Sequence, residues 1–145
     1  MNRGANIAKA IPHSSVLFTC AVLGNTTSAP TVPADGQETA ASSKWPLGAN
    51  GVDKSTAGIP TRTSTGIYTV TYAHQLAHVV PAGSPSVISG GSAPTTALYA
   101  IITSIVPATR VVTVKVYAPG GTLTDLGTSD MLVIPLMGYD TNKPA

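Results

Sequence analysis

The stretch from Arg110 to Tyr117 (Arg-Val-Val-Thr-Val-Lys-Val-Tyr) has the clearest pattern in the chain. Every even position after Arg110 is valine, while the odd positions mix valine, threonine, lysine and tyrosine. Strict alternation with period two is typical of a β-strand that buries one face. Pro119-Gly120-Gly121 follows and indicates a turn, after which Thr122–Asp125 begins the return of a hairpin.

Other predicted strands are short and are bounded by proline or glycine. They are Ser14–Leu23, Gly66–Tyr72, Val79–Val80, Val87–Ser89, Leu98–Val106 and Met131–Met137. Pro135 inside the last strand indicates an edge position or a bulge. The only helix expected is one possible turn at Ala73–His78. No other stretch of greater length has apolar residues that repeat every 3.6 residues. The sequence therefore predicts an all-β, jelly-roll-like sandwich or barrel.

The 145 residues form one structural domain with two parts. Residues 1–65 hold the first strand and a long irregular arm rich in Pro, Gly, Ser and Thr, and residues 66–145 form the main β-sandwich body. The first strand is expected to cross back and complete a sheet. Trp45 and Leu47, inside the arm, are the candidate partner contacts, and Trp45 docks either on this chain's own sheet or on a neighbouring subunit. Removing residues 1–62 is expected to abolish partner binding and leave the sheet folded.

Composition narrows the function classes. Charged residues are 10% of the chain and the net charge is +2, against about 25% charged residues in an ordinary domain. Scattered cations do not make a nucleic-acid surface, and no apolar run is long enough to span a membrane. Cys20, the only cysteine, has apolar neighbours and is expected to be a buried, inert thiol. A surface so poor in charge favours association, so we expect a dimer or trimer within a larger assembly.

No motif points to catalysis, a cofactor or a metal. Asp125 and Asp130 flank a turn and are expected to bond their own backbone there. His74 and His78 lack a nearby acid, so they are expected to be surface or interface side chains and not zinc ligands. Gly83-Ser84-Pro85-Ser86 departs from the nucleophile-elbow pattern at Pro85. The chain is therefore predicted not to be an enzyme and to bind no cofactor.

Residues 66–139 resemble the small jelly-roll structural proteins of tailed bacteriophages. The matching segments are Gly66-Ile-Tyr-Thr-Val, the Arg110–Tyr117 strand, Gly121-Thr-Leu-Thr-Asp125, and Asp130 before the last strand. A weaker similarity to C1q-like jelly rolls exists, without the collagen-like repeats. The resemblance implies a capsid decoration (cement) protein on the outer surface of a virion, bound to the major capsid protein and bridging its subunits.

The alternative is a receptor- or glycan-binding module of a head fibre, spike or tail fibre, because jelly rolls also serve as lectins. Tyr99, Tyr117 and Tyr139 are the aromatic side chains available for such a role, although their positions in the strands suit packing better.

Overall fold

The computed structural model describes residues 15–24, 30–31, 52, 60–73, 75–88, 97–128 and 130–139. Its strands are β1 (Ser15–Leu23), β2 (Thr61–Ser64), β3 (Ile67–Thr71), β4 (His78–Pro81), β5 (Ser86–Ile88), β6 (Tyr99–Val106), β7 (Val111–Tyr117) and β8 (Met131–Tyr139). No described residue lies in a helix, and none belongs to a helix long and apolar enough to cross a membrane. The expected helical turn at Ala73–His78 is not formed by its described residues, since His78 begins β4.

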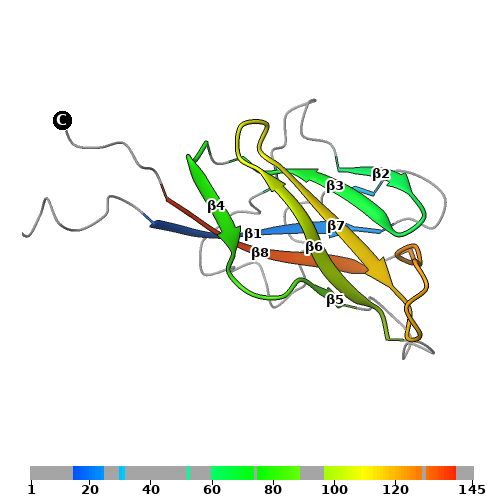
Figure 1. The fold of residues 1–145 in the computed structure, drawn as a ribbon. Coiled ribbons are helices and arrows are strands. Elements are labelled where there is room, and N and C mark those ends of the chain that lie inside the picture. The colour runs from blue at the N-terminus through cyan, green and yellow to red at the C-terminus, as the bar shows by residue number, and fades with distance from the viewer. Residues whose placement is uncertain are drawn as a thin grey trace, which may run out of the picture.

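The strands form two antiparallel sheets that lie face to face. In the first, here called the β8 sheet, β8 pairs with β1 on one side and with β4 and β5 on the other. In the second, the β7 sheet, the order is β2-β3-β7-β6. In Figure 1, β6 and β7 cross in front of β8 at an angle, as expected for two packed layers. The prediction of an all-β sandwich is confirmed.

The core lies between the two sheets and draws on both parts of the chain. The even-numbered valines of β7 are fully buried, as the alternation predicted. Phe18, Cys20 and Val22 of β1 are buried in the same cluster, and the Phe18 and Tyr72 rings meet across the two layers with centroids 5.5 Å apart. The first strand therefore completes a sheet, as expected. A cut after residue 62 would remove β1 and its buried side chains from this cluster. We therefore expect it to destabilise the sheet, in contrast to the expectation from the sequence that the sheet stays folded.

Pro135 shows why β8 can carry a proline at the centre of a sheet. The Pro135 carbonyl accepts a hydrogen bond from the Ala82 backbone N–H over 3.0 Å. In an antiparallel strand the nitrogen and carbonyl of one residue point to the same side. The Pro135 nitrogen, which has no hydrogen to donate, therefore faces residues 82–85. There the neighbouring strand is interrupted between β4 and β5, so no ladder hydrogen bond is lost. The irregularity expected at Pro135 exists, but it is in the partner strand, and β8 itself is not an edge.

Strand β2 was not predicted, because its four residues fall at the end of the irregular arm. The turn at Pro119-Gly120-Gly121 is present, and both glycines have positive φ angles, of 99° and 86°. The return that follows is limited to one bridge between Leu123 and Tyr117. The hairpin prediction therefore holds for the turn and fails for the second strand.

Candidate functional site

Trp45 and Leu47, the partner contacts predicted from the sequence, lie outside the described residues, so their role stays a prediction. Within the described part of the chain, the strongest candidate for a contact surface is the outer face of the β8 sheet. Three large apolar side chains form a row across it, one from each of three neighbouring strands. Leu17 of β1 lies opposite Met137 of β8, which lies opposite Val80 of β4.

Strand alternation explains why this row points outward. Residues 132, 134, 136 and 138 of β8 are buried against the core, so the odd-numbered Met137 must face away from it. Leu17 is 54% exposed, while Met137 and Val80 are each 38% exposed. Side chains directly opposite on neighbouring strands are in contact range, so the three form one continuous strip. We call Leu17, Met137 and Val80 the apolar row.

An aromatic pair lies beside the apolar row, two residues further along β4 and β8. The His78 and Tyr139 rings stack with centroids 5.0 Å apart and an interplanar angle of 18°, and both side chains are exposed. His78 is thus a surface residue, as expected, while His74 lies outside the described residues. An apolar centre with a polar aromatic margin is the usual composition of a protein–protein contact. The arrangement can bind another protein surface by excluding water from the row.

The sequence did not point to the apolar row, although Leu17 and Met137 both lie in predicted strands. Their contact depends on the pairing of the first strand with the last, and neither strand carries a local signal for that pairing. The outward direction of Leu17 was also hidden, since Val16–Leu23 is an almost continuous apolar run.

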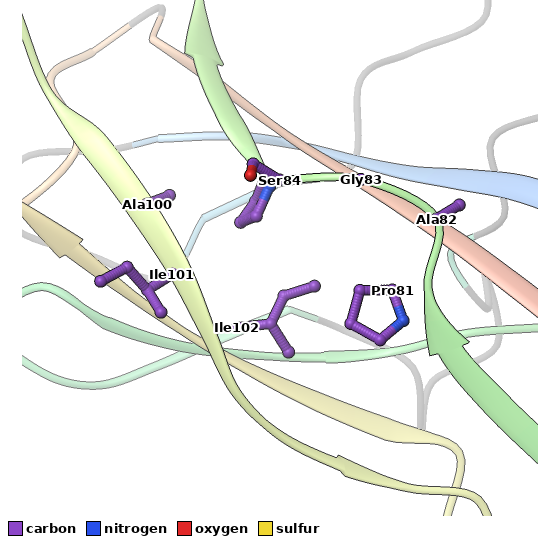
Figure 2. Close-up of a pocket in the computed structure, with 8 residues that line it drawn as sticks. Pro81, Ala82, Gly83, Ser84, Ala100, Ile101 and Ile102 are labelled. Atoms are coloured by element: carbon purple, nitrogen blue, oxygen red, sulfur yellow. The ribbon is translucent and has the colours of Figure 1, made fainter.

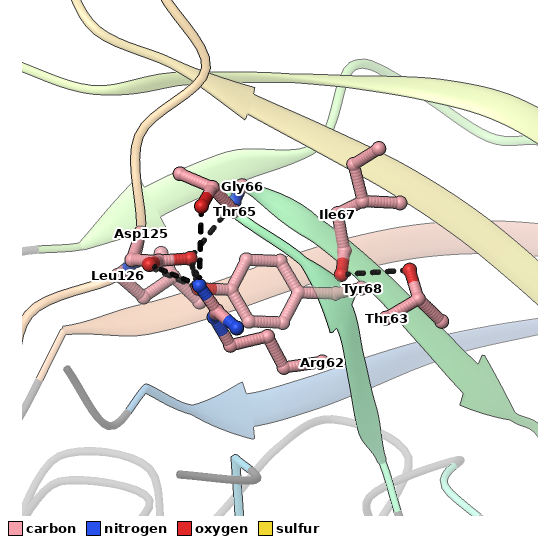
Figure 3. A network of polar contacts seen from close by, with 8 residues as sticks. All are labelled: Arg62, Thr63, Thr65, Gly66, Ile67, Tyr68, Asp125 and Leu126. Atoms are coloured by element: carbon pink, nitrogen blue, oxygen red, sulfur yellow. Dashed lines mark hydrogen bonds and ion pairs between the residues drawn. The ribbon is translucent and has the colours of Figure 1, made fainter. Parts of the chain in front are cut away.

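The polar network of the molecule is centred on Asp125 and supports the fold (Figure 3). Arg62 donates from Nε to Oδ1 of Asp125 over 2.9 Å and from Nη2 to Oδ2 over 2.8 Å. The Gly66 backbone N–H donates to Oδ1 over 2.8 Å, and the Tyr68 hydroxyl donates to Oδ1 over 3.3 Å. The network joins the β2–β3 turn to the segment between β7 and β8.

Asp125 and Asp130 were both expected to bond the backbone of their own turn. Asp130 does so, because its Oδ2 accepts from the Gly127 N–H over 2.7 Å. Asp125 instead bonds the backbone of Gly66, 59 residues away, and pairs with Arg62. The bidentate hydrogen bond from Arg62 is the main reason that the pKa of Asp125 lies below its ordinary value.

Two buried tyrosines differ in how their hydroxyl groups are satisfied. The Tyr68 hydroxyl accepts from the Leu126 backbone N–H over 2.8 Å as well as donating to Asp125. The Tyr72 hydroxyl is buried and has no hydrogen-bond partner in the described structure. A buried polar group without a hydrogen-bond partner destabilises a protein, so removing such a group costs nothing. Removing a group that has a partner is different, because its partner is then left buried and unsatisfied.

These two residues make a matched pair of substitutions. Tyr68→Phe is expected to lower the free energy of unfolding by about 2 kcal/mol, because it leaves the Leu126 N–H without a hydrogen-bond acceptor. Tyr72→Phe is expected to leave stability unchanged or to raise it by up to about 1 kcal/mol. Urea unfolding followed by circular dichroism measures both. Equal losses in the two variants would contradict this account of the hydroxyl groups.

Cys20 is fully buried, and burial raises the pKa of its thiol to about 12, so the thiol stays protonated at neutral pH. The prediction that Cys20 is buried is confirmed. No cluster of three or more His, Cys, Asp or Glu side chains suited to a metal ion occurs among the described residues.

Comparisons with protein-family models, with curated proteins and with solved structures each found no match. The functional argument therefore depends on the chain's own surface, its composition and the resemblance of its sequence pattern described above.

Proposed function

We propose that this protein is a structural component of a virus particle. In this role it decorates the outer surface of the capsid, docks through the outer face of the β8 sheet, and bridges neighbouring major capsid subunits. The observation that carries the proposal is the apolar row, in which Leu17, Met137 and Val80 are aligned across three strands and exposed together. The low charge of the chain and its resemblance to phage decoration proteins support the same role.

The proposed mechanism is mechanical. Burying the apolar row against a capsid subunit removes apolar surface from water, which contributes about 25 cal/mol per Å² of buried area. A protein that binds only the assembled shell stabilises that state by mass action. Trp45 and Leu47 are proposed as further contacts in the same interface. Their role can be tested by Trp45→Ala and Leu47→Ala, which leave β1 in place.

Quantitative mass spectrometry of native particles from the source that encodes this chain tests the proposal. A ratio near one copy per one or a few major shell subunits is the expected result. A few copies per particle would favour a spike or fibre component instead. Absence from every particle would overturn the proposal of a virion protein.

A matched pair of valines tests the docking face. Val80 lies in the apolar row and Val106 lies on the β7 sheet, with 38% and 42% exposure. Val80→Lys is expected to reduce binding to shells that lack the chain by more than about tenfold, because it buries an unpaired charge in the contact. Val106→Lys is expected to bind normally. Equal binding of the two variants, measured by co-sedimentation with shells, would rule out the β8 sheet as the docking face.

A glycan-binding role is the second candidate, and one observation favours it. The Tyr99 and Tyr117 rings stack at the surface of the β7 sheet with centroids 5.4 Å apart. Exposed aromatic side chains have an apolar body and a polar hydroxyl, which suits contact with a sugar ring. A glycan array probed with the intact protein tests this role, and Tyr99→Ala should remove any signal that depends on the pair.

A further inference from the structure

At the β6 edge of the β7 sheet, no other described strand pairs with the outward backbone groups. The Val116 N–H bonds to the Gly66 carbonyl, and the Tyr72 N–H bonds to the Arg110 carbonyl, so the even positions of β7 face β3. The odd positions of β7 therefore face β6, where Lys115 is paired with Ile101 and Tyr117 with Tyr99. In β6 the backbone groups of Ala100 and Ile102 consequently point away from β7, toward the free edge.

Of the features that normally protect an edge strand, β6 has an irregularity in its pairing with β7 between Ile102 and Ser104, beyond the regular stretch Tyr99–Ile102. It lacks charged side chains and proline in its eight residues, Tyr-Ala-Ile-Ile-Thr-Ser-Ile-Val. Three of its side chains, Tyr99, Ile101 and Val106, are exposed large hydrophobics. Natural edge strands are usually short, charged, covered or interrupted by proline, because an open apolar edge pairs with another strand.

A groove runs beside the free edge. It has a volume of about 500 Å³ and is lined by residues 81–85 of the β4–β5 connection and by residues 100–102 of β6. Figure 2 shows the Pro81 and Ile102 side chains both lying in the space between β6 and the β4–β5 connection. An added strand at the β6 edge would have room there for the side chains of its inner face.

We propose that the β6 edge is a self-association site, at which two copies of this chain pair their β6 strands antiparallel about a two-fold axis. The axis passes beside Ile101. Ala100 of one copy then exchanges two backbone hydrogen bonds with Ile102 of the other, and the reverse pair does the same. On the inner face each small Ala100 side chain lies opposite a larger Ile102, and the groove accommodates the difference in size.

The charge of the strand selects a second copy as the occupant. Antiparallel pairing about Ile101 brings the same short stretch of two copies together, so a charge in this stretch would lie near a like charge of the partner copy. β6 is neutral. Lys115, which is paired with Ile101, lies one strand further in. The two Lys115 residues of a dimer are separated by three strand spacings, about 14 Å, which exceeds the Debye length of about 10 Å at 0.1 M salt. A charged peptide would find no complementary charge on this edge.

Sedimentation equilibrium of the purified full-length chain, without any shell, tests the proposal independently of capsid binding. The wild-type chain is expected to form a dimer in a concentration-dependent way. Ile101→Lys should weaken the dimer by more than about tenfold, because it places two like charges on the two-fold axis. Ile88→Lys is the matched control, since both isoleucines are 47% exposed and Ile88 lies in the other sheet. A wild-type monomer at every concentration would overturn the proposal, as would equal loss of the dimer in both variants.

The register is tested by cross-linking. Ile101→Cys places two thiols opposite each other in a non-hydrogen-bonded pair, at a Cβ separation of about 4.5–5.5 Å. Oxidation by diamide should then give a disulfide-linked dimer, while Cys20 stays unreacted because it is buried. Val106→Cys should give none, since the two copies of this position lie roughly 30 Å apart along the paired strands. Cross-linking through position 106 and not through position 101 would contradict the register.

Discussion

Phe18→Ala is expected to lower the free energy of unfolding by about 3–5 kcal/mol, the usual cost of truncating a buried phenylalanine. Phe18 is 3% exposed and its ring packs against Tyr72 across the two sheets. Its loss leaves a cavity between β1 and the β7 sheet, which the neighbouring backbone cannot close. The effect is large enough to decide whether the first strand belongs to the same folding unit as the body.

Leu17→Ala is the control for this substitution, because Leu17 is the neighbouring residue of β1 and points to the outer face. Its loss is expected to change stability by less than about 0.5 kcal/mol. Both variants should unfold in one transition when followed by fluorescence and by circular dichroism. Two separate transitions in Phe18→Ala would contradict the single core and would restore the view that residues 66–145 fold independently.

A strand could be predicted where its own residues carry the signal, either as alternating apolar side chains or as proline and glycine at its ends. β7 is the clearest case, since its pattern predicts both the strand and the face that is buried. The centre of the β8 sheet could not be predicted in this way. Pro135 indicates an edge or a bulge when β8 is considered alone. Only the interruption of the neighbouring strand, between Pro81 and Ser86, shows how a central strand accommodates it.

The candidate contact surfaces depend on pairings that are distant in the sequence. The apolar row requires the first and last strands to be neighbours, and the free edge of β6 requires the order β2-β3-β7-β6. Neither arrangement has a local signal. The low charge of the sequence predicts that the chain associates, and this stays a prediction. The candidate contact residues follow only from the sheet order.

The same limit explains why the network around Asp125 was missed. Arg62 and Asp125 are 63 residues apart, and neither has a local sequence signal that points to the other. Asp125 was correctly placed beside a turn, but the turn whose backbone it bonds is that of β2–β3. The β2–β3 turn requires glycine at position 66. Its φ angle of +67° suits glycine, and an added Cβ would lie 2.7 Å from the Val116 carbonyl oxygen.

Asp125→Ala is expected to lower the free energy of unfolding by about 3 kcal/mol at neutral pH. The change leaves the Gly66 N–H and the Tyr68 hydroxyl without their acceptor, and hydrogen bonds to a charged group are among the strongest. Asp130→Ala is the matched control, because its carboxylate accepts one backbone hydrogen bond in its own turn. It is expected to cost about 1 kcal/mol. Urea unfolding measures both variants. Equal losses of unfolding free energy would show that the Asp125 network contributes no more to stability than the single hydrogen bond of Asp130.

The charge of Asp125 makes a pH-dependent contribution whose sign follows from its lowered pKa. A carboxylate with a lower pKa in the folded state than in the unfolded state stabilises the fold above the unfolded pKa, which is about 4 for aspartate. That contribution is lost as the pH falls from about 4 toward the folded pKa, because the unfolded state takes up a proton over this range while the folded state stays ionised. Asp125→Asn keeps the shape of the side chain and removes the titration. The stability difference between wild type and Asp125→Asn should therefore be largest at pH 7 and shrink at pH 3. A difference that stays constant between these two pH values would show that the negative charge of Asp125 contributes nothing to the network.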